Sequence, residues 1–310
     1  MWQNPAAMKI EDDNGLSDLL LGEETRLCTG FGFTEGPIWI AADNALVFSD
    51  IPGNRMHRWR PGQTAAEVYR EPSGWSNGLT LDAGGNILAC EHGGRRVSRA
   101  PYADPTAMTA IATHWNGTRL NSPNDIVVHS SGAIFFTDPT YGADSGRNPR
   151  FGYEGQQPEI GFQGVYRIDV DGSLQLVVGE GFTQPNGLAF TPDESALYIG
   201  DSQERLIWRY EVGPGLTLGN RVLFVDQRGD PRRGAPDGMK VDSEGRLWTT
   251  GAGGVSCWQP DGACAGRFES EEHAANLTFG GPAFSTLFLT AGTSVFAVET
   301  KARGLVPGSR

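Results

Sequence analysis

The chain has 310 residues, enough to bury a sizeable core in one large domain or in two domains of ordinary size. It contains 43 Gly and 19 Pro, and 38% of its residues are hydrophobic, which excludes disorder of the whole chain. Its formal net charge of −12 at pH 7 excludes the basic surface that nucleic-acid binding requires. It has no uninterrupted apolar run of about 18 residues, so no transmembrane helix is predicted.

Residues 1–23 precede the repetitive part of the chain and read as an acidic N-terminal extension. Their short apolar run has no basic region before it, so they do not resemble a secretory signal. We therefore expect a cytoplasmic protein, or a periplasmic one if the N-terminus is processed. Residues 24–300 are expected to form a single domain, and residues 301–310 a C-terminal tail.

Six segments repeat one pattern: a polar residue, a short apolar strand, a turn rich in Asp, Gly, Ser or Pro, and a second apolar strand. Each reads as a β-hairpin. We call the first residues of the hairpins the opening residues, and they recur every roughly 40–60 residues, the period of a propeller blade. They are Glu35, Asn77, Asn124, Asn186, Asp237 and Asn276.

Weaker strands follow the hairpins, most clearly at residues 164–180, and give each repeat four strands. The last repeat lacks its outermost strand, and residues 24–30 are placed to fill that gap, which would remove an open sheet edge. The sequence therefore predicts an all-β fold: a six-bladed β-propeller with four antiparallel strands per blade, closed by an N-terminal strand in the last blade.

In a propeller, the first strand of each blade lines the central channel, so the six opening residues are expected at one mouth. All six carry side-chain oxygens, and two are carboxylates. Such a set suits Ca²⁺, whereas zinc prefers His or Cys; other divalent cations stay possible. The alternative is that Asn-Gly and Asp-Gly serve only as turn residues, although Glu35 is a poor turn former.

The second strands return to the same mouth and predict a second acidic ring there. Its members are Asp50, Glu91 with His92, Asp138 and Asp201. The alternative role for these acids is to cap strand ends. The long interval before Asn186 places an insertion, residues 140–163, at this mouth, where it acts either as a lid or as a surface excursion.

Four motifs, each at the start of a blade, carry a resemblance to a known family: EGPIW at Glu35, RLNSPND at 119–125, QPNGLAF at 184–190 and PDGMKVD at 236–242. In these residues the chain resembles the SMP-30/gluconolactonase/LRE-like family of calcium-dependent lactonase propellers, from about residue 24 to residue 299. The resemblance implies a metal held by Glu35, Asn186 and Asp237, with Asn124 at or beside it. It also implies Asp237 as the general base.

The motifs TDPTYG at 137–142 and CEHGGRR at 90–96 are similar to the bacterial gluconolactonase-type branch rather than the animal branch. This adds pocket candidates to the positions that the resemblance places near substrate. The candidate substrate-binding residues are Arg119, Asn121, Asn124, His92, Asn77 and Tyr141.

The preferred hypothesis is hydrolysis of a sugar lactone to the aldonic acid, with Ca²⁺ polarising the carbonyl and a carboxylate activating water. Asp237 is the first candidate for this base and Asp138 the second. No GxSxG motif is present, which favours direct hydrolysis. Alternatives are a non-sugar lactone or phosphotriester, with walls from Trp75, Phe151 and Tyr153, or a non-catalytic propeller that binds calcium for stability and a ligand for sensing.

Overall fold

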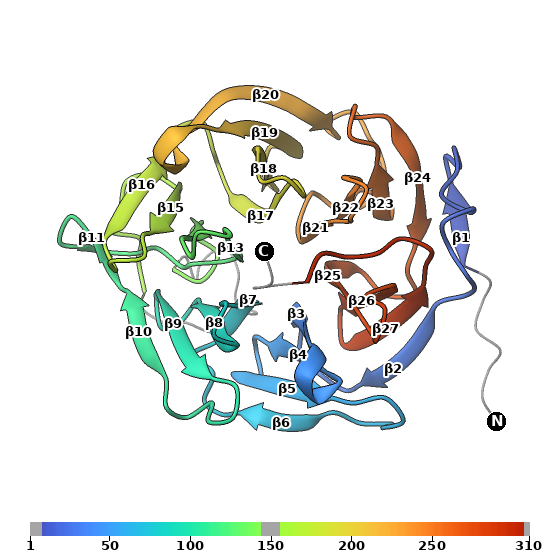
Figure 1. The fold of residues 1–310 in the computed structure, drawn as a ribbon, viewed down its shortest axis with the longest axis horizontal. Coiled ribbons are helices and arrows are strands. Elements are labelled where there is room, and N and C mark those ends of the chain that lie inside the picture. The colour runs from blue at the N-terminus through green and yellow to red at the C-terminus, as the bar shows by residue number, and fades with distance from the viewer. Residues whose placement is uncertain (1–7, 144–155, 307–310) are drawn as a thin grey trace.

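The computed structural model describes residues 8–143 and 156–306. In it, six antiparallel sheets, five of four strands and one of five, stand around a central axis (Figure 1). The predicted six-bladed β-propeller is therefore confirmed, and the described residues contain no α-helix.

Blades one to three follow in chain order from the channel outward. Blade one holds β3 (Thr34–Ile40), β4 (Ala45–Asp50), β5 (Arg55–Trp59) and β6 (Glu67–Arg70). Blade two holds β7 (Ser76–Leu81), β8 (Asn86–Glu91), β9 (Arg96–Pro101) and β10 (Thr109–Ala112). The short pair β11 (His114–Trp115) and β12 (Thr118–Arg119) leads to blade three, which holds β13 (Ile126–Val128), β14 (Ile134–Asp138), β15 (Gly164–Ile168) and β16 (Leu174–Val178).

Blade four holds β17 (Pro185–Phe190), β18 (Ala196–Asp201), β19 (Leu206–Val212) and β20 (Leu218–Asp226). Blade five holds β21 (Met239–Val241), β22 (Leu247–Gly251), β23 (Gly254–Trp258) and β24 (Cys264–Glu269). Blade six holds β25 (Ala274–Gly280), β26 (Thr286–Ala291), β27 (Ser294–Glu299) and, as its outer strand, β2 (Thr25–Thr29). Two 3₁₀ turns, η1 (Ala41–Asp43) and η3 (Pro214–Leu216), complete the elements of the described residues.

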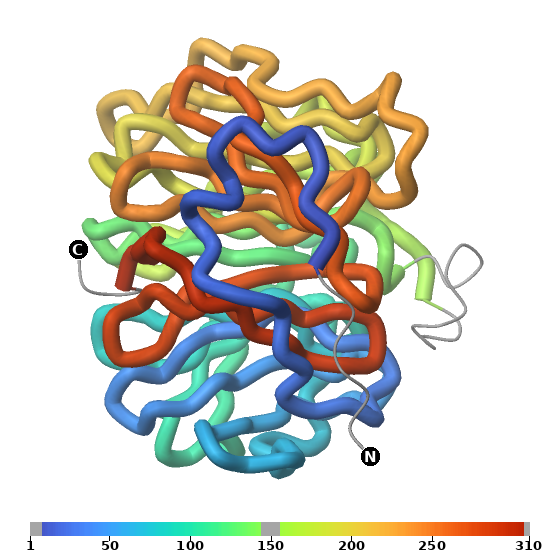
Figure 2. Tube along the Cα trace, turned by 90° about the vertical axis from the view of Figure 1, so that its right-hand side faces the viewer, coloured from blue at the N-terminus to red at the C-terminus, as the bar shows by residue number. Residues whose placement is uncertain are grey.

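The ring closes as predicted, because β2 pairs antiparallel with β27, with Thr25 opposite Ala297 and Thr29 opposite Ser294. A further strand was not foreseen: β1 (Lys9–Glu11) pairs with β24 and gives blade five a fifth strand. Figure 2 shows this N-terminal segment crossing the outside of the last two blades.

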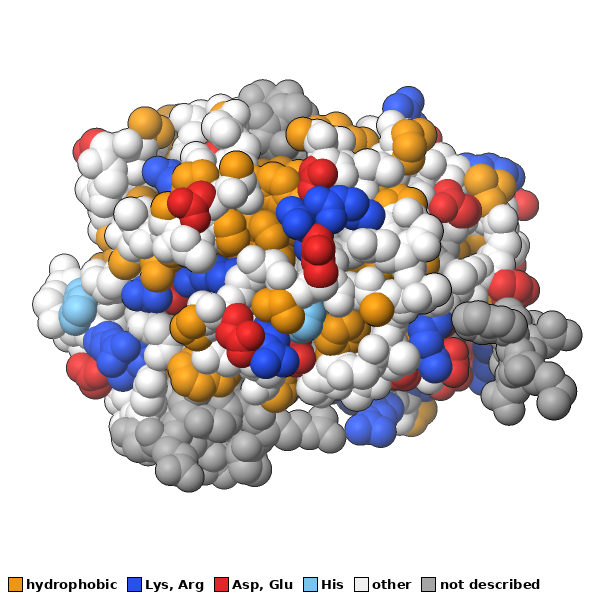
Figure 3. All heavy atoms as spheres, turned by 90° about the horizontal axis from the view of Figure 1, so that it is seen from below, with side chains coloured by type: hydrophobic (Ala, Val, Ile, Leu, Met, Phe, Trp, Pro, Cys, Tyr) orange, Lys and Arg blue, Asp and Glu red, His pale blue; other side chains and the backbone are white. Residues whose placement is uncertain are grey.

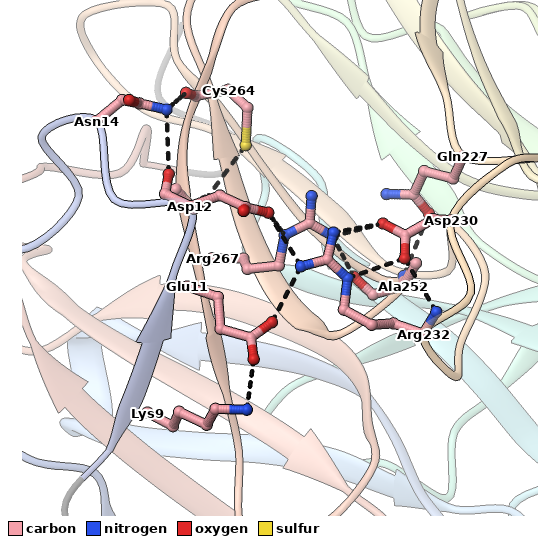
Figure 4. A network of polar contacts seen from close by, with 11 residues as sticks. Lys9, Glu11, Asp12, Asn14, Gln227, Asp230, Arg232, Ala252, Cys264 and Arg267 are labelled. Atoms are coloured by element: carbon pink, nitrogen blue, oxygen red, sulfur yellow. Dashed lines mark hydrogen bonds and ion pairs between the residues drawn. The ribbon is translucent and has the colours of Figure 1, made fainter.

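Side chains fasten the N-terminal segment to blade five. Leu16 is fully buried in a cluster with Trp248 and Phe268. Figure 4 shows the polar contacts beside it: the guanidinium of Arg232 donates to Glu11 at 2.9 Å, to Asp12 at 2.9 Å and to Asp230 at 2.7 Å. The loop that leads toward Asp237 is thus tied to the N-terminal strand.

The hydrophobic core lies between neighbouring blades, because alternate side chains of a strand face opposite sides. On β14, Phe135 packs edge-on against Phe190 of blade four, with ring centroids 5.2 Å apart. Its neighbour Phe136 points the other way, into the cluster shared with Leu88 of blade two. This explains why the second strand of each hairpin is almost wholly apolar.

The six innermost strands surround a cavity of about 110 Å³ whose walls include Ile38, Leu79, Ile126 and Leu188. The polar opening residues are thus confined to the ends of these strands.

On the side drawn in Figure 3, charged side chains of both signs are scattered among hydrophobic and neutral ones. Within residues 8–143 and 156–306, no helix has the length and apolar character that crossing a membrane requires.

Candidate functional site

The opening residues of neighbouring blades pack directly against one another, with Gly as the spacer. A Cβ on Gly36, whose φ is +49°, would lie 1.9 Å from the carbonyl oxygen of Asn77. A Cβ on Gly187 would lie 2.0 Å from the carbonyl oxygen of Asp237. The Gly after an opening residue is therefore required by close backbone approach between blades.

Other contacts complete this ring. The backbone N–H of Gly78 donates to the carbonyl of Asn124 at 2.8 Å, and Thr137 Oγ1 donates to the carbonyl of Asn186 at 2.8 Å. The side-chain amide of Asn276 donates to Glu35 Oε2 at 2.9 Å, which joins blade six to blade one. The six opening residues therefore form one continuous ring.

Glu35, Asn186 and Asp237 interact electrostatically within this ring. Burial raises the pKa of Glu35 to about 7, although hydrogen bonds from Asn276 and from the backbone of Gly36 oppose the shift. The pKa of Asp237 is raised well above its usual value by desolvation and by the charges of Glu35 and Asp125, while a hydrogen bond from Asn186 lowers it. Three residues that the sequence assigns to one metal are thus close together.

Asp125 is a residue of this centre that the sequence reasoning did not select. It is 2% exposed, and its Oδ1 accepts the backbone N–H of Ile126 at 2.9 Å. Its Oδ2 is buried and has no well-formed hydrogen bond among the described residues, although the backbone N–H of Leu188 is near enough to lower the pKa of the carboxylate. Burial raises its pKa. The sequence does contain a signal for this residue: Asn124 is followed by an acid, whereas four of the other opening residues are followed by Gly.

The donor chemistry of this centre fits a hard divalent cation. The charge of Asp125 raises the pKa of Glu35 and of Asp237, and the charge of Glu35 also raises the pKa of Asp237. The charge of Lys240 lowers the pKa of Glu35 and of Asp125. A divalent cation would relieve this repulsion and supply a partner for the buried Oδ2 of Asp125. The described residues contain no group of three or more His, Cys, Asp and Glu side chains that could hold a metal, so a cation here would need amide oxygens as ligands as well.

His92 lies between two opening residues and is 1% exposed. Its Nε2 is 3.1 Å from Nδ2 of Asn77 and 3.4 Å from Nδ2 of Asn124. Burial lowers its pKa to about 3, so the ring is neutral. The pocket candidate His92 therefore bridges two neighbouring blades.

Asp138 holds the loop that precedes Asn124. Its carboxylate is fully buried, and its two oxygens accept the backbone N–H groups of Asn121 and Ser122, each at 2.8 Å. Burial raises its pKa to about 7, against the effect of these two hydrogen bonds. We use the name loop clamp for such an Asp. Its carboxylate binds two backbone N–H groups, those of the residues three and two positions before an opening residue.

The loop clamp recurs in two other blades. Asp201 accepts the N–H groups of Thr183 at 2.7 Å and Gln184 at 3.2 Å, ahead of Asn186. Asp50 does the same ahead of Glu35, with the N–H groups of Gly32 and Phe33, each at 3.1 Å. Glu91 differs, because its oxygens are occupied by Arg70 at 2.8 Å and Arg96 at 2.6 Å. Three members of the predicted second acidic ring thus bind backbone N–H groups of the loops that precede the opening residues.

The remaining substrate candidates have different surroundings. Asn121 is fully buried, and its amide donates to the carbonyls of Asp138 at 3.2 Å and Phe162 at 2.9 Å. Arg119 is partly buried and donates to the carbonyl of Gly94 at 3.0 Å. Tyr141 is partly exposed beside Asn186, with which its hydroxyl interacts.

Of the predicted apolar wall, Trp75 packs on Ile51 together with Phe33. Phe151 and Tyr153 lie outside the described residues, as does half of the predicted lid. The cluster at Trp75 is therefore the one part of this wall that the structure locates.

Comparison with known proteins now identifies the family. The model of the SMP-30/Gluconolactonase/LRE-like region matches residues 33–293. The chain belongs to this family. The family prediction is therefore confirmed, as is the prediction that the chain is an enzyme, a lactonase.

Among its relatives, a gluconolactonase of Zymomonas mobilis is 32% identical over 295 residues, which cover 88% of this chain and 80% of that protein. A pentonolactonase of Haloferax volcanii is 30% identical over 263 residues, covering 83% of this chain and 80% of that protein. The solved structure of a gluconolactonase of Xanthomonas campestris superimposes with a TM-score of 0.84 and 32% identity, covering 97% of this chain and 98% of that one.

Proposed function

We propose that this family member hydrolyses a sugar lactone to the open-chain aldonic acid and that it requires a divalent cation, with Ca²⁺ as the first candidate. The observation that carries the proposal is the interaction of Glu35, Asn186 and Asp237 within one ring of opening residues. The names of its relatives, a gluconolactonase and a pentonolactonase, support a sugar lactone as substrate.

In this proposal, the cation is held by oxygens of Glu35, Asn124, Asn186 and Asp237. Two carboxylates and two amide oxygens match the preference of Ca²⁺ for oxygen ligands, with water or substrate completing the shell. When bound, the cation polarises the lactone carbonyl and stabilises the negative charge that develops on its oxygen.

We assign the general base to Asp237 rather than to Asp138. A general base must reach the water from which it takes a proton. Asp237 is partly exposed, whereas Asp138 is fully buried with a backbone N–H on each oxygen. Asp237 accepts a proton as water adds to the carbonyl carbon, the ring C–O bond then breaks, and the proton passes to the ring oxygen, which becomes a hydroxyl.

Substrate contacts are proposed for Tyr141 and Arg119, with Asn121 in a supporting role. Tyr141 is partly exposed next to Asn186, and its pKa is raised mainly by burial, so its hydroxyl stays protonated and donates to a lactone oxygen. Arg119 forms none of the ion pairs found among the described residues, which leaves its charge for the product carboxylate. Asn121 supports the loop between them through its buried amide.

Acid release from lactones tests this proposal. The purified chain is assayed with six-carbon and five-carbon sugar lactones, a non-sugar lactone and a phosphotriester, after subtraction of spontaneous hydrolysis, with EDTA and then with restored Ca²⁺. We expect turnover of the sugar lactones that EDTA abolishes and Ca²⁺ restores. Turnover of only the non-sugar lactone or the phosphotriester would contradict a sugar lactone as substrate. Tight Ca²⁺ binding without any turnover would indicate a ligand-binding propeller that is not an enzyme.

A further inference from the structure

His92 has a fixed place in the fold because its backbone is bound on both sides. It follows directly after β8 and is 1% exposed. Its N–H donates to the carbonyl of Trp75 at 3.0 Å, and its own carbonyl accepts the N–H of Arg95 at 3.2 Å. The imidazole therefore extends from a backbone that is held at both its N–H and its carbonyl.

One ring nitrogen of His92 faces two amide groups. Nδ2 of Asn77 and Nδ2 of Asn124 approach the same Nε2, at 3.1 and 3.4 Å. An amide nitrogen only donates, so with both amides turned this way Nε2 acts as the acceptor, which requires the ring proton on Nδ1.

This arrangement decides which end of each amide faces the site. An Asn side chain has its oxygen and its NH₂ group on opposite sides, and either end fits the same space. Because the NH₂ groups of Asn77 and Asn124 are directed to His92, their Oδ1 atoms are directed away from it. A flipped amide would present N–H to the cation position, which repels a cation.

We propose that His92 is a positioning residue, whose Nε2 holds the Asn77 and Asn124 amides with their oxygens available to a cation and its substrate. The inference rests on the proposed function, since Asn124 is one of the four proposed ligands. It makes a further claim, that the amide oxygens of the ligand Asn124 and of the substrate candidate Asn77 are oriented by an imidazole that does not bind the ion itself. Groups that orient metal ligands typically change metal affinity by about 10- to 100-fold when they are removed.

Calcium titration by calorimetry tests the inference, with the melting temperature in EDTA as the folding control. Phe keeps the ring but has no acceptor, so His92→Phe is expected to weaken Ca²⁺ binding about 10- to 100-fold. Gln offers an acceptor oxygen near the place of Nε2, so His92→Gln is expected to recover most of the affinity. The matched control is His129→Phe, because His129 follows β13 at its far end and bonds to Ser131.

Two results would overturn the inference alone: native affinity in His92→Phe, or equal losses in His92→Phe and His92→Gln. A native chain that binds no Ca²⁺ would instead contradict the proposed function, and the inference would fall with it. If His92→Phe does not fold, ¹⁵N spectra of the native protein still decide, since a proton on Nε2 of His92 is incompatible with the proposed role.

Discussion

The carboxylate of Asp138 accepts a 2.8 Å hydrogen bond from the backbone N–H of Asn121, 17 residues earlier in the chain. Its second oxygen accepts the N–H of Ser122 at the same distance. Both oxygens are thus occupied in a place that solvent does not reach. Asp138, which the sequence makes a candidate for the general base, therefore has the surroundings of a loop clamp.

Asp138→Asn distinguishes the two roles. Asn keeps one acceptor oxygen and directs an NH₂ group at a backbone N–H, so we expect a loss of about 1–3 kcal/mol in the free energy of unfolding. The displaced loop should raise KM for the lactone about tenfold, while the pH dependence of kcat keeps its shape. Urea denaturation and steady-state kinetics between pH 5 and 9 measure these effects.

The matched control is Asp201→Asn, because Asp201 clamps the loop before Asn186 in the same way. Its loss of stability should be similar to that of Asp138→Asn. If Asp138→Asn alone lowers kcat by about 100-fold or more, with KM, Ca²⁺ affinity and stability intact, Asp138 is the base.

Asp237→Asn tests the residue assigned both to the cation and to the base. The variant keeps a side-chain oxygen and loses one of the two ligand charges, so Ca²⁺ affinity in calorimetry should fall at least about 100-fold and lactone turnover about 1,000-fold. Asp261→Asn, at an exposed turn, is the control and should change neither. Normal turnover in Asp237→Asn would exclude Asp237 from both roles.

Removal of the cation should change how stability depends on pH. The pKa of Glu35 is raised to about 7 and that of Asp237 is raised well above its usual value, so the folded chain without metal holds protons that the unfolded chain releases. Their contribution to stability is complete below the unfolded pKa of about 4 and is lost as pH rises through about 7. In EDTA, melting temperatures should therefore decrease from pH 5 to pH 8.

Calcium should reverse this trend, because the ionised carboxylates bind it. The increase in melting temperature caused by Ca²⁺ should be several degrees larger at pH 8 than at pH 5, and Glu35→Gln should reduce this difference. An increase of the same size at both pH values would show that Ca²⁺ does not bind at these carboxylates.

The sequence was sufficient to predict the propeller because the hairpin signal is local. An opening residue such as Asn186, an apolar strand and a turn occur within about 16 residues, and the signal repeats six times. A single repeat does not explain why a Gly follows the opening residue. Gly187 is required because the carbonyl of Asp237, in the next blade, occupies the space of a Cβ.

The roles of the second ring could not be predicted, since they depend on contacts between distant segments. An Asp at a strand end is equally compatible with a base and with a clamp until the loop at Asn121 is seen to fold against it. His92 has no local pattern that reveals its two Asn partners. The three-residue strand β1 likewise pairs with residues more than 250 positions away, among them Glu269.

The N-terminal segment should contribute to stability mainly through one side chain. Leu16 is fully buried against the core of blades five and six, so Leu16→Ala should lower the free energy of unfolding by about 2–5 kcal/mol. Leu21, five residues later, is 56% exposed, and Leu21→Ala should change it by less than about 0.5 kcal/mol. Because Leu16 packs into the hydrophobic cluster of blades five and six and the N–H of Leu21 donates to the carbonyl of Glu299, neither residue belongs to the ring of opening residues, and lactone turnover at 25 °C should remain in both folded variants. Equal unfolding curves for the two variants in urea would show that residues 8–20 do not pack on the propeller in solution.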